Sequence, residues 1–223
     1  MYEIEIKSLL GSKEAADRLL ETLKRKDPDL VKVGENSQLN HYFVGGNREK
    51  LQKIMQKYIS REEGEKLAEI LSEAKELSIR TRKADSLVLF VLKASIDDTT
   101  SSNGTARIEF EVPVSLAIDE LDNLLLESDC DVQAKWSRER KEYALQDGTH
   151  ICFDRNAGYG YLVEFERVVK DASQSEEVKK ELRSLMEELH VKELPQDRLA
   201  RMFEHYNAHW EEYYGTEKTF EIQ

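Results

Sequence analysis

The sequence predicts an α+β fold in which an antiparallel sheet of about eight strands carries helices on its outside. Several segments alternate apolar and polar residues, which is the period of a half-buried strand. Amphipathic segments with apolar residues three and four positions apart lie between and after them, as expected for surface helices. Hydrophobic residues make up 39% of the 223, enough for a core, and only 3 prolines and 10 glycines argue against a disordered chain.

In chain order, the predicted strands cover residues 2–7, 38–44, 77–83, 86–94, 106–114, 134–145, 150–155 and 161–169. The predicted helices cover 12–26, 48–59 and 116–127, with further helices beginning at Ser60, near Ser173 and at about Asp197. Ser60 opens an SREE motif in which Glu63 can complete a capping box.

The helices at about 47–76 form a predicted insertion in the strand order, and the polar stretch 97–105 predicts a loop. No linker rich in proline or glycine divides the chain, so we expect one domain over 1–223. Its sheet is expected within about 1–170 and its C-terminal helices at about 173–214.

The composition excludes some classes of protein. The net charge of −12 argues against a general nucleic-acid binder, which needs a positive surface. Cys130 and Cys152 lack the spacing of a metal site and fit buried thiols in a reduced cytoplasmic protein. The N-terminus does not read as a signal peptide, and the longest apolar run, 87–92, is too short to span a bilayer. We therefore expect a cytoplasmic protein without a nucleic-acid or membrane partner.

The first predicted strand, YEIEIK, places three charged side chains on one face, because side chains alternate across a strand. The same arrangement recurs in later strands. The charged residues of this pattern are Glu3, Glu5, Lys7, Arg80, Arg82, Lys93, Arg107, Glu109, Glu111, Arg138, Arg140, Glu164 and Glu166.

For any single strand, a solvated sheet face would explain these charges. The repetition argues against that explanation, because like charges two positions apart repel unless an oppositely charged group binds them. A sheet closed into a barrel, with the charged faces inward and the apolar faces under the helices, resolves the conflict. Carboxylates in such a lumen suit a hard cation such as Mg²⁺ or Mn²⁺, and arginines suit phosphate oxygens. The pattern thus favours a metal-bound polyphosphate.

Taken in order, the charged motifs resemble the signature of the CYTH superfamily, also called triphosphate tunnel metalloenzymes. Glu3-x-Glu5-x-Lys7 resembles its ExExK strand. LSIRTRK resembles the family's paired-basic strand, FVLK its lysine-ending strand and RIEFEVPV its R-x-E-x-E strand. RERKEY resembles its K-x-R-x-x-Y element. FDRNAGYGYLVEFE resembles the element in which an Asp precedes a glycine turn and an E-x-E strand.

The resemblance covers roughly residues 1 to 170, and four features depart from it. The helical insertion at 48–76 is longer than in the plain family pattern. Arg138 replaces a lysine, the lysine-ending strand reads LKAS without the usual Gly-Pro, and Val44 follows the Tyr-Phe pair where the family often has an acidic residue.

The resemblance implies a single CYTH-like domain with an eight-stranded antiparallel β-barrel tunnel, a charged lumen, surrounding helices and a bound divalent metal, Mg²⁺ or Mn²⁺. It implies metal ligands at Glu3, Glu5, Asp154, Glu164 and Glu166. It implies phosphate-binding residues at Lys7, Arg80, Arg82, Lys93, Arg107, Arg138 and Arg140. It implies catalytic roles for Glu5, Lys7, Glu109 and Glu111, the last two binding a second metal or orienting water.

Triphosphate hydrolysis is the expected reaction, with tripolyphosphate, ATP or thiamine triphosphate as substrate. One alternative is a class IV adenylyl cyclase that makes cyclic AMP and pyrophosphate from ATP, because both reactions need the triphosphate held. Another is a non-catalytic module that binds polyphosphate or a nucleotide. A base pocket would favour the cyclase, and its candidate aromatic residues, which fit the core equally well, are Tyr42, Phe43, Trp136 and Tyr159.

Two further features have more than one interpretation. His41 could contact substrate, although a packed or surface histidine is the more ordinary interpretation. The helices after residue 170 could brace the barrel, close one mouth or form a homodimer contact.

Overall fold

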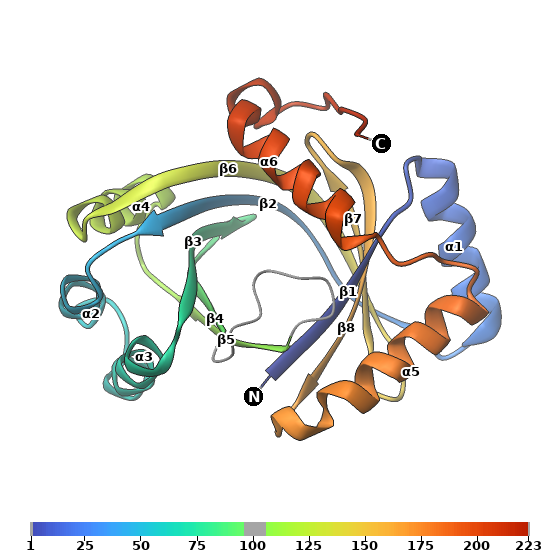
Figure 1. Cartoon of the computed structure of the whole chain (residues 1–223), viewed down its shortest axis with the longest axis horizontal. Coiled ribbons are helices and arrows are strands. Elements are labelled where there is room, and N and C mark those ends of the chain that lie inside the picture. Colours follow the sequence, from blue (N-terminus) through green and yellow to red (C-terminus); the bar gives the residue numbers. More distant parts are fainter. Residues whose placement is uncertain (1, 96–105, 223) are drawn as a thin grey trace. The chain divides into compact units, whose positions relative to one another are not determined.

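The computed structural model describes residues 2–95 and 106–222, in which eight strands form a closed antiparallel barrel (Figure 1). The strand order is β1-β5-β4-β3-β2-β6-β7-β8. The strands are β1 (Tyr2–Leu9), β2 (Val31–Gly45), β3 (Glu76–Ala84), β4 (Leu87–Ser95), β5 (Ala106–Pro113), β6 (Cys130–Ala144), β7 (His150–Asn156) and β8 (Gly160–Val169). The helices are α1 (Lys13–Lys26), α2 (Arg48–Met55), α3 (Arg61–Glu73), α4 (Ile118–Glu127), the short 3₁₀ helix η1 (Ala172–Gln174), α5 (Ser175–Glu188) and α6 (Gln196–Tyr213).

The predicted α+β barrel with surrounding helices is confirmed. Two strands begin earlier than their side-chain patterns indicate: β2 at Val31 and β6 at Cys130. In β2 the extra residues include Val31 and Val33, which are exposed, so backbone conformation rather than burial defines this part of the strand. The helix predicted from Ser173 begins at Ser175, after η1. The loop predicted over 97–105 lies outside the described residues.

The described residues divide into two compact units, each treated by itself below. Unit 1 contains residues 2–37, 106 and 137–222, and unit 2 contains residues 38–95 and 107–136. The prediction of a single domain stays a prediction.

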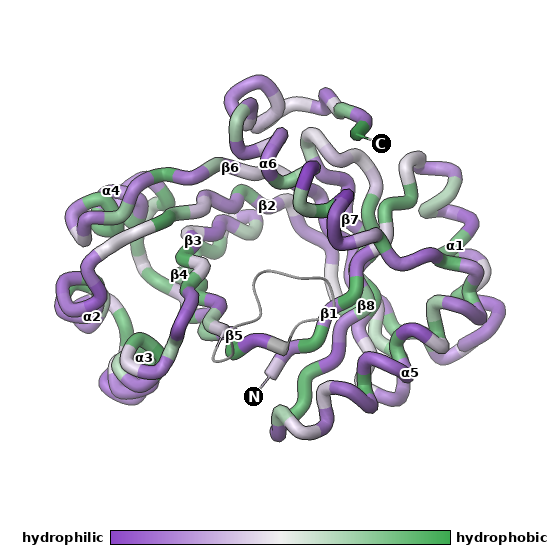
Figure 2. Tube along the Cα trace, viewed as in Figure 1, coloured by the Kyte–Doolittle hydropathy of each residue, from purple (hydrophilic) through white to green (hydrophobic). Residues whose placement is uncertain are grey.

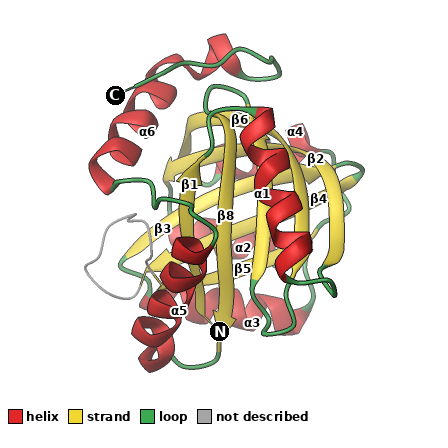
Figure 3. Ribbon diagram, turned by 90° about the vertical axis from the view of Figure 1, so that its right-hand side faces the viewer, coloured by secondary structure: helices red, strands yellow, loops and turns green. Residues whose placement is uncertain are grey.

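In unit 1, one face of the strands is apolar and is covered by helices. Ile4, Ile6 and Phe165 are fully buried in a core that α1 and α5 complete through Leu23 and Leu182. Both helices lie against β8, and α5 also contacts β1 (Figure 3). Hydrophobic and hydrophilic residues alternate along these helices (Figure 2), as an amphipathic helix on a sheet requires.

Unit 2 repeats this arrangement with its own helices. Phe43, Phe90 and Phe110 belong to a core that also includes apolar residues of α2, α3 and α4. The helices α2 and α3 lie between β2 and β3 in the chain, at the position where the sequence predicts the helical insertion. The capping box at the start of α3 is confirmed, with Glu63 N donating to Ser60 Oγ (3.2 Å) and Ser60 N donating to Glu63 (2.7 Å).

The C-terminal segment of unit 1 packs against the turn between β7 and β8. The Gly158 amide donates to the Lys218 carbonyl, and the Phe220 amide donates to the Gly158 carbonyl, both at 2.8 Å. Gly158 has a φ of +82°, and a Cβ there would lie 2.6 Å from the Tyr206 ring. Beside it, the Tyr159 ring contacts Tyr206 and Phe220. The predicted C-terminal helices therefore brace their own unit.

Two smaller expectations concern thiols and membranes. Cys130 and Cys152 are both free and buried, as predicted. Across residues 2–95 and 106–222, every helix is too short or too polar to cross a bilayer.

Replacement of Leu182 by alanine tests whether the packing of α5 on the strands stabilises unit 1. The side chain is fully buried, so we expect Leu182→Ala to lower the free energy of unfolding by about 2–5 kcal/mol. Urea denaturation followed by circular dichroism measures the change. Leu126→Ala, at an exposed position of α4, should change stability by only about 0.5 kcal/mol. Equal losses in the two variants would contradict the assigned core.

Candidate active site

The charged face of unit 1 is the strand face turned away from its helices. It carries Glu3, Glu5 and Lys7 of β1, Arg138 and Arg140 of β6, Asp154 of β7, and Glu164 and Glu166 of β8. Strand pairing brings these residues together. Glu5 lies opposite Glu166 and Lys7 opposite Glu164 in the β1–β8 ladder, whereas Arg140 lies opposite Asp154 in the β6–β7 ladder.

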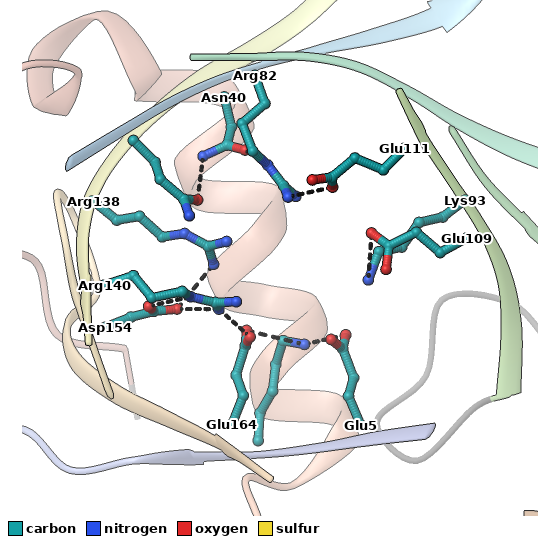
Figure 4. A network of polar contacts seen from close by, with 12 residues as sticks. Glu5, Asn40, Arg82, Lys93, Glu109, Glu111, Arg138, Arg140, Asp154 and Glu164 are labelled. Carbon is teal, nitrogen blue, oxygen red and sulfur yellow. Dashed lines mark hydrogen bonds and ion pairs between the residues drawn. The ribbon is translucent and has the colours of Figure 1, made fainter. Parts of the chain in front are cut away.

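Arg140 is at the centre of the ion pairs on this face (Figure 4). Its Nε donates to Asp154 Oδ1 and its Nη2 to Oδ2, both at 2.7 Å, in the bidentate geometry that guanidinium and carboxylate groups favour. Nη2 also donates to Glu164. Arg138 Nη1 donates to Asp154 Oδ2 at 2.9 Å. Although burial opposes the charged form, Asp154 and Glu164 raise the pKa of Arg140.

Lys7 is held between two carboxylates. Its ammonium donates to Glu5 and lies 3.3 Å from Glu164 Oε1. Burial by itself would raise the pKa of Glu164, but Lys7 and Arg140 outweigh it and lower that pKa to about 2. Glu164 is therefore ionised throughout the neutral range.

A cluster of carboxylates lies next to these ion pairs. Oxygen atoms of Glu3, Glu5 and Glu166 all lie within 4.8 Å of one another. The pKa of Glu166 is raised to about 8, mainly by burial. Arg140 acts to lower this pKa, whereas the charges of Glu3, Glu164 and Glu5 raise it further. Such a concentration of negative charge, made only of hard oxygen donors, fits a divalent cation such as Mg²⁺ or Mn²⁺.

The charged face of unit 2 carries the other predicted residues: Arg80, Arg82, Lys93, Arg107, Glu109 and Glu111. Arg82 donates to Glu111 Oε2 (2.6 Å) and to Asn40 Oδ1 (2.8 Å). Lys93 lies opposite Glu109 in the β4–β5 ladder, with Nζ 3.5 Å from Oε1 (Figure 4).

An aromatic group adjoins the basic residues of unit 2. The Arg80 guanidinium lies 4.5 Å from the centre of the Tyr42 ring, a distance typical of a cation–π contact. The Tyr42 and Trp136 rings are 6.1 Å apart. Of the four aromatic candidates, Phe43 and Tyr159 belong instead to the cores of their units.

A buried polar network in unit 2 is absent from the sequence predictions. Asp122 of α4 accepts from Thr81 Oγ1 (2.6 Å), and its Oδ2 lies 2.7 Å from His41 Nδ1. These hydrogen bonds lower the pKa of Asp122 although burial acts to raise it. His41 is thus a packed histidine. The signal in the sequence is a carboxylate beside Leu121 on the apolar face of α4, where only a partnered group is stable.

The structure therefore brings the predicted residues into two groups, one in each unit. In unit 1 the five predicted metal ligands differ in the groups that surround them. Oxygens of Glu3, Glu5 and Glu166 lie close together, although Glu5 also accepts from Lys7. Asp154 and Glu164 are both bound to the Arg140 guanidinium. Metal ligation by any of the five stays a prediction.

The class of protein is defined by a closed barrel whose strands carry strong charge on one face and pack under helices on the other. The sequence matches the model of the CYTH domain over residues 1–199, and the chain belongs to this family. The predicted resemblance is thereby confirmed. No curated protein matches the sequence.

Solved structures share the fold at low sequence identity. A conserved hypothetical protein from Pyrococcus furiosus has 19% identity and a TM-score of 0.60, covering 85% of this chain and 91% of that chain. A protein from Pyrococcus horikoshii OT3 has 21% identity and a TM-score of 0.60, covering 87% and 94%. A "putative adenylate cyclase" from Vibrio parahaemolyticus has 15% identity and a TM-score of 0.58, covering 86% and 90%.

Removal of Arg140 tests the ion pairs of unit 1. Arg140→Ala leaves Asp154, which is fully buried, without its bidentate partner, so we expect unfolding to become about 3–5 kcal/mol easier. Arg155→Ala, on the opposite face of β7 with a partly exposed side chain, should cost less than about 1 kcal/mol. Guanidinium denaturation of both variants measures the difference, and comparable losses would show that Arg140 is not essential to this face.

The raised pKa of Glu166 predicts how stability depends on pH. Above the ordinary value of 4.5 the unfolded state loses this proton, whereas the folded state retains it up to about pH 8. Stability should therefore decrease as pH rises through this window. Thermal unfolding of the metal-free protein should show this decrease, and Glu166→Gln should flatten it. If both proteins lose stability in parallel, the carboxyl of Glu166 is not the group that titrates.

Proposed function

We propose that this CYTH protein is a divalent-metal-dependent enzyme that hydrolyses a triphosphate. The observation that carries the proposal is the carboxylate cluster of Glu3, Glu5 and Glu166 on the same strand face as Lys7 and Arg140. Carboxylates can hold a hard cation, and the neighbouring cations can bind phosphoryl oxygens. A metal-bound triphosphate needs both.

In this proposal Mg²⁺ or Mn²⁺ is held by Glu3, Glu5 and Glu166, whose oxygens already lie within 4.8 Å of one another. When bound, the metal neutralises phosphoryl oxygens and lowers the pKa of a coordinated water. Asp154 and Glu164 are the other predicted ligands, and in this structure they hold Arg140.

The side chains of the protein then bind and orient the phosphates. Asp154 fixes the Arg140 guanidinium through two hydrogen bonds, so its direction is set before substrate arrives. Such preorganised cations stabilise the charge that develops in phosphoryl transfer. Lys7 and Arg138 have the same role in unit 1. For unit 2 we propose phosphate binding by Arg80, Arg82, Lys93 and Arg107, and orientation of water by Glu109 and Glu111.

The alternative reaction is formation of cyclic AMP and pyrophosphate from ATP. The stack of Arg80 on Tyr42, with Trp136 beside it, favours this alternative because aromatic rings can receive a nucleobase. The description of the Vibrio parahaemolyticus protein agrees with it. Hydrolysis remains our first proposal because it needs no base pocket.

Phosphorus-31 NMR separates the reactions. The protein is incubated with Mg²⁺ or Mn²⁺ and, in separate samples, with tripolyphosphate, thiamine triphosphate or ATP. We expect orthophosphate from at least one of them. Pyrophosphate with a cyclic nucleotide from ATP would instead establish the cyclase. Binding of each substrate without turnover would identify a non-catalytic module.

Glu5→Gln tests the carboxylate cluster. Loss of one charged ligand should reduce turnover about 100-fold or more, while circular dichroism shows an intact fold. Glu139→Gln is the matched control, because Glu139 is an exposed residue on the opposite face of β6. Full activity of Glu5→Gln would exclude Glu5 as a metal ligand.

A further inference from the structure

A second group of potential ligands lies farther along the charged face of unit 1. It consists of Glu142 of β6, Cys152 of β7 and Glu166 of β8, whose ligand atoms all lie within 4.8 Å of one another. The strand register produces this proximity. Cys152 lies directly opposite Glu142 in one ladder, and its neighbour His150 at i−2 lies opposite Glu166 in the other.

The donor atoms of this group differ in kind from those of the Glu3–Glu5–Glu166 cluster. One thiol sulfur joins two carboxylates, whereas the first cluster offers oxygen alone. Thiolate ligands select Zn²⁺ and similar cations over Mg²⁺ and Mn²⁺. Three protein ligands also leave the fourth position of a tetrahedral ion open, as in zinc sites that hold a water molecule.

His150 supports one of these ligands. Its Nδ1 lies 2.5 Å from Glu142 Oε1, so the ring fixes the position of that carboxylate. Carboxylates that bind a metal are usually held in place by hydrogen bonds from neighbouring groups, which is the role of His150 here. The side chains of His150 and Glu142 are 38% and 27% exposed, whereas Cys152 is fully buried. An ion could therefore enter from the His150 side and reach the sulfur.

We propose that Glu142, Cys152 and Glu166 bind a thiophilic divalent cation of the Zn²⁺ type, with His150 positioning Glu142. Because Glu166 belongs to both groups, a Zn²⁺ ion here competes with the hard cation for one carboxylate. This competition, unlike the site itself, rests on the proposed function. The ion would thereby act as an inhibitor of the metal-dependent reaction.

The environment of Cys152 favours the protonated thiol, so a cation that binds there must displace the proton. Burial, followed by the charges of Glu166 and Glu164, raises the pKa of the thiol although Arg140 acts to lower it. Because the thiolate is the form that binds a metal, binding of the ion releases the thiol proton.

Cobalt(II) provides the test, because a Co²⁺–thiolate bond gives a charge-transfer absorption that carboxylate ligands do not produce. Metal-free full-length protein is titrated with Co²⁺, and Zn²⁺ is then added to displace it. We expect this absorption in the wild type and in Cys130→Ser, which changes the other buried thiol. Cys152→Ser should abolish it, and His150→Ala should weaken Co²⁺ binding about 10-fold or more.

Absence of the absorption from the wild type, or its survival in Cys152→Ser, would overturn the inference. If Cys152→Ser fails to fold, Glu142→Gln serves instead, because its side chain is partly exposed. In that variant, a thiolate absorption that appears at the same Co²⁺ concentration as in the wild type would equally overturn the site. The absorption needs no turnover, so an inactive protein that shows it would refute only the proposed function. An active protein that lacks it would refute only the zinc-type site.

Discussion

The guanidinium group of Arg140 binds carboxylates from two other strands, Asp154 of β7 and Glu164 of β8, and the charged face of unit 1 depends on it. Without this cation, a fully buried carboxylate would lie beside further negative charge, at a cost larger than most single contacts can offset. With it, three strands are joined across their ladders by side chains. The remaining carboxylates, Glu3, Glu5 and Glu166, can then stay close together in a folded protein.

In each unit, one face of the strands stabilises the fold and the other carries the charged residues of the candidate site. In unit 1 the apolar residues pack under α1 and α5, and in unit 2 under α2, α3 and α4. Burial of these residues stabilises the folded state and offsets the repulsion between like charges on the opposite face. Substitutions on the apolar face should therefore act on folding, whereas many on the charged face can act on binding without loss of the core.

The alternation of residues was sufficient to predict which side chains share a face. It placed Glu3 with Glu5 and Glu164 with Glu166, and the ordered motifs predicted the CYTH family. The partners of each carboxylate could not be predicted, because they depend on strand register and on the reach of long side chains. The group of Glu142, Cys152 and Glu166 could not be predicted for the same reason, because its members come from separate strands.

The glycine at the turn between β7 and β8 has a consequence for how such sequences diverge. Gly158 accepts the C-terminal segment only because it lacks a Cβ, which would collide with the Tyr206 ring of α6. A larger residue at the turn requires a smaller one on the helix, or the loss of the packed tail. These two positions should therefore covary during evolution, and exchange of α6 between homologues would succeed only when the turn is exchanged with it.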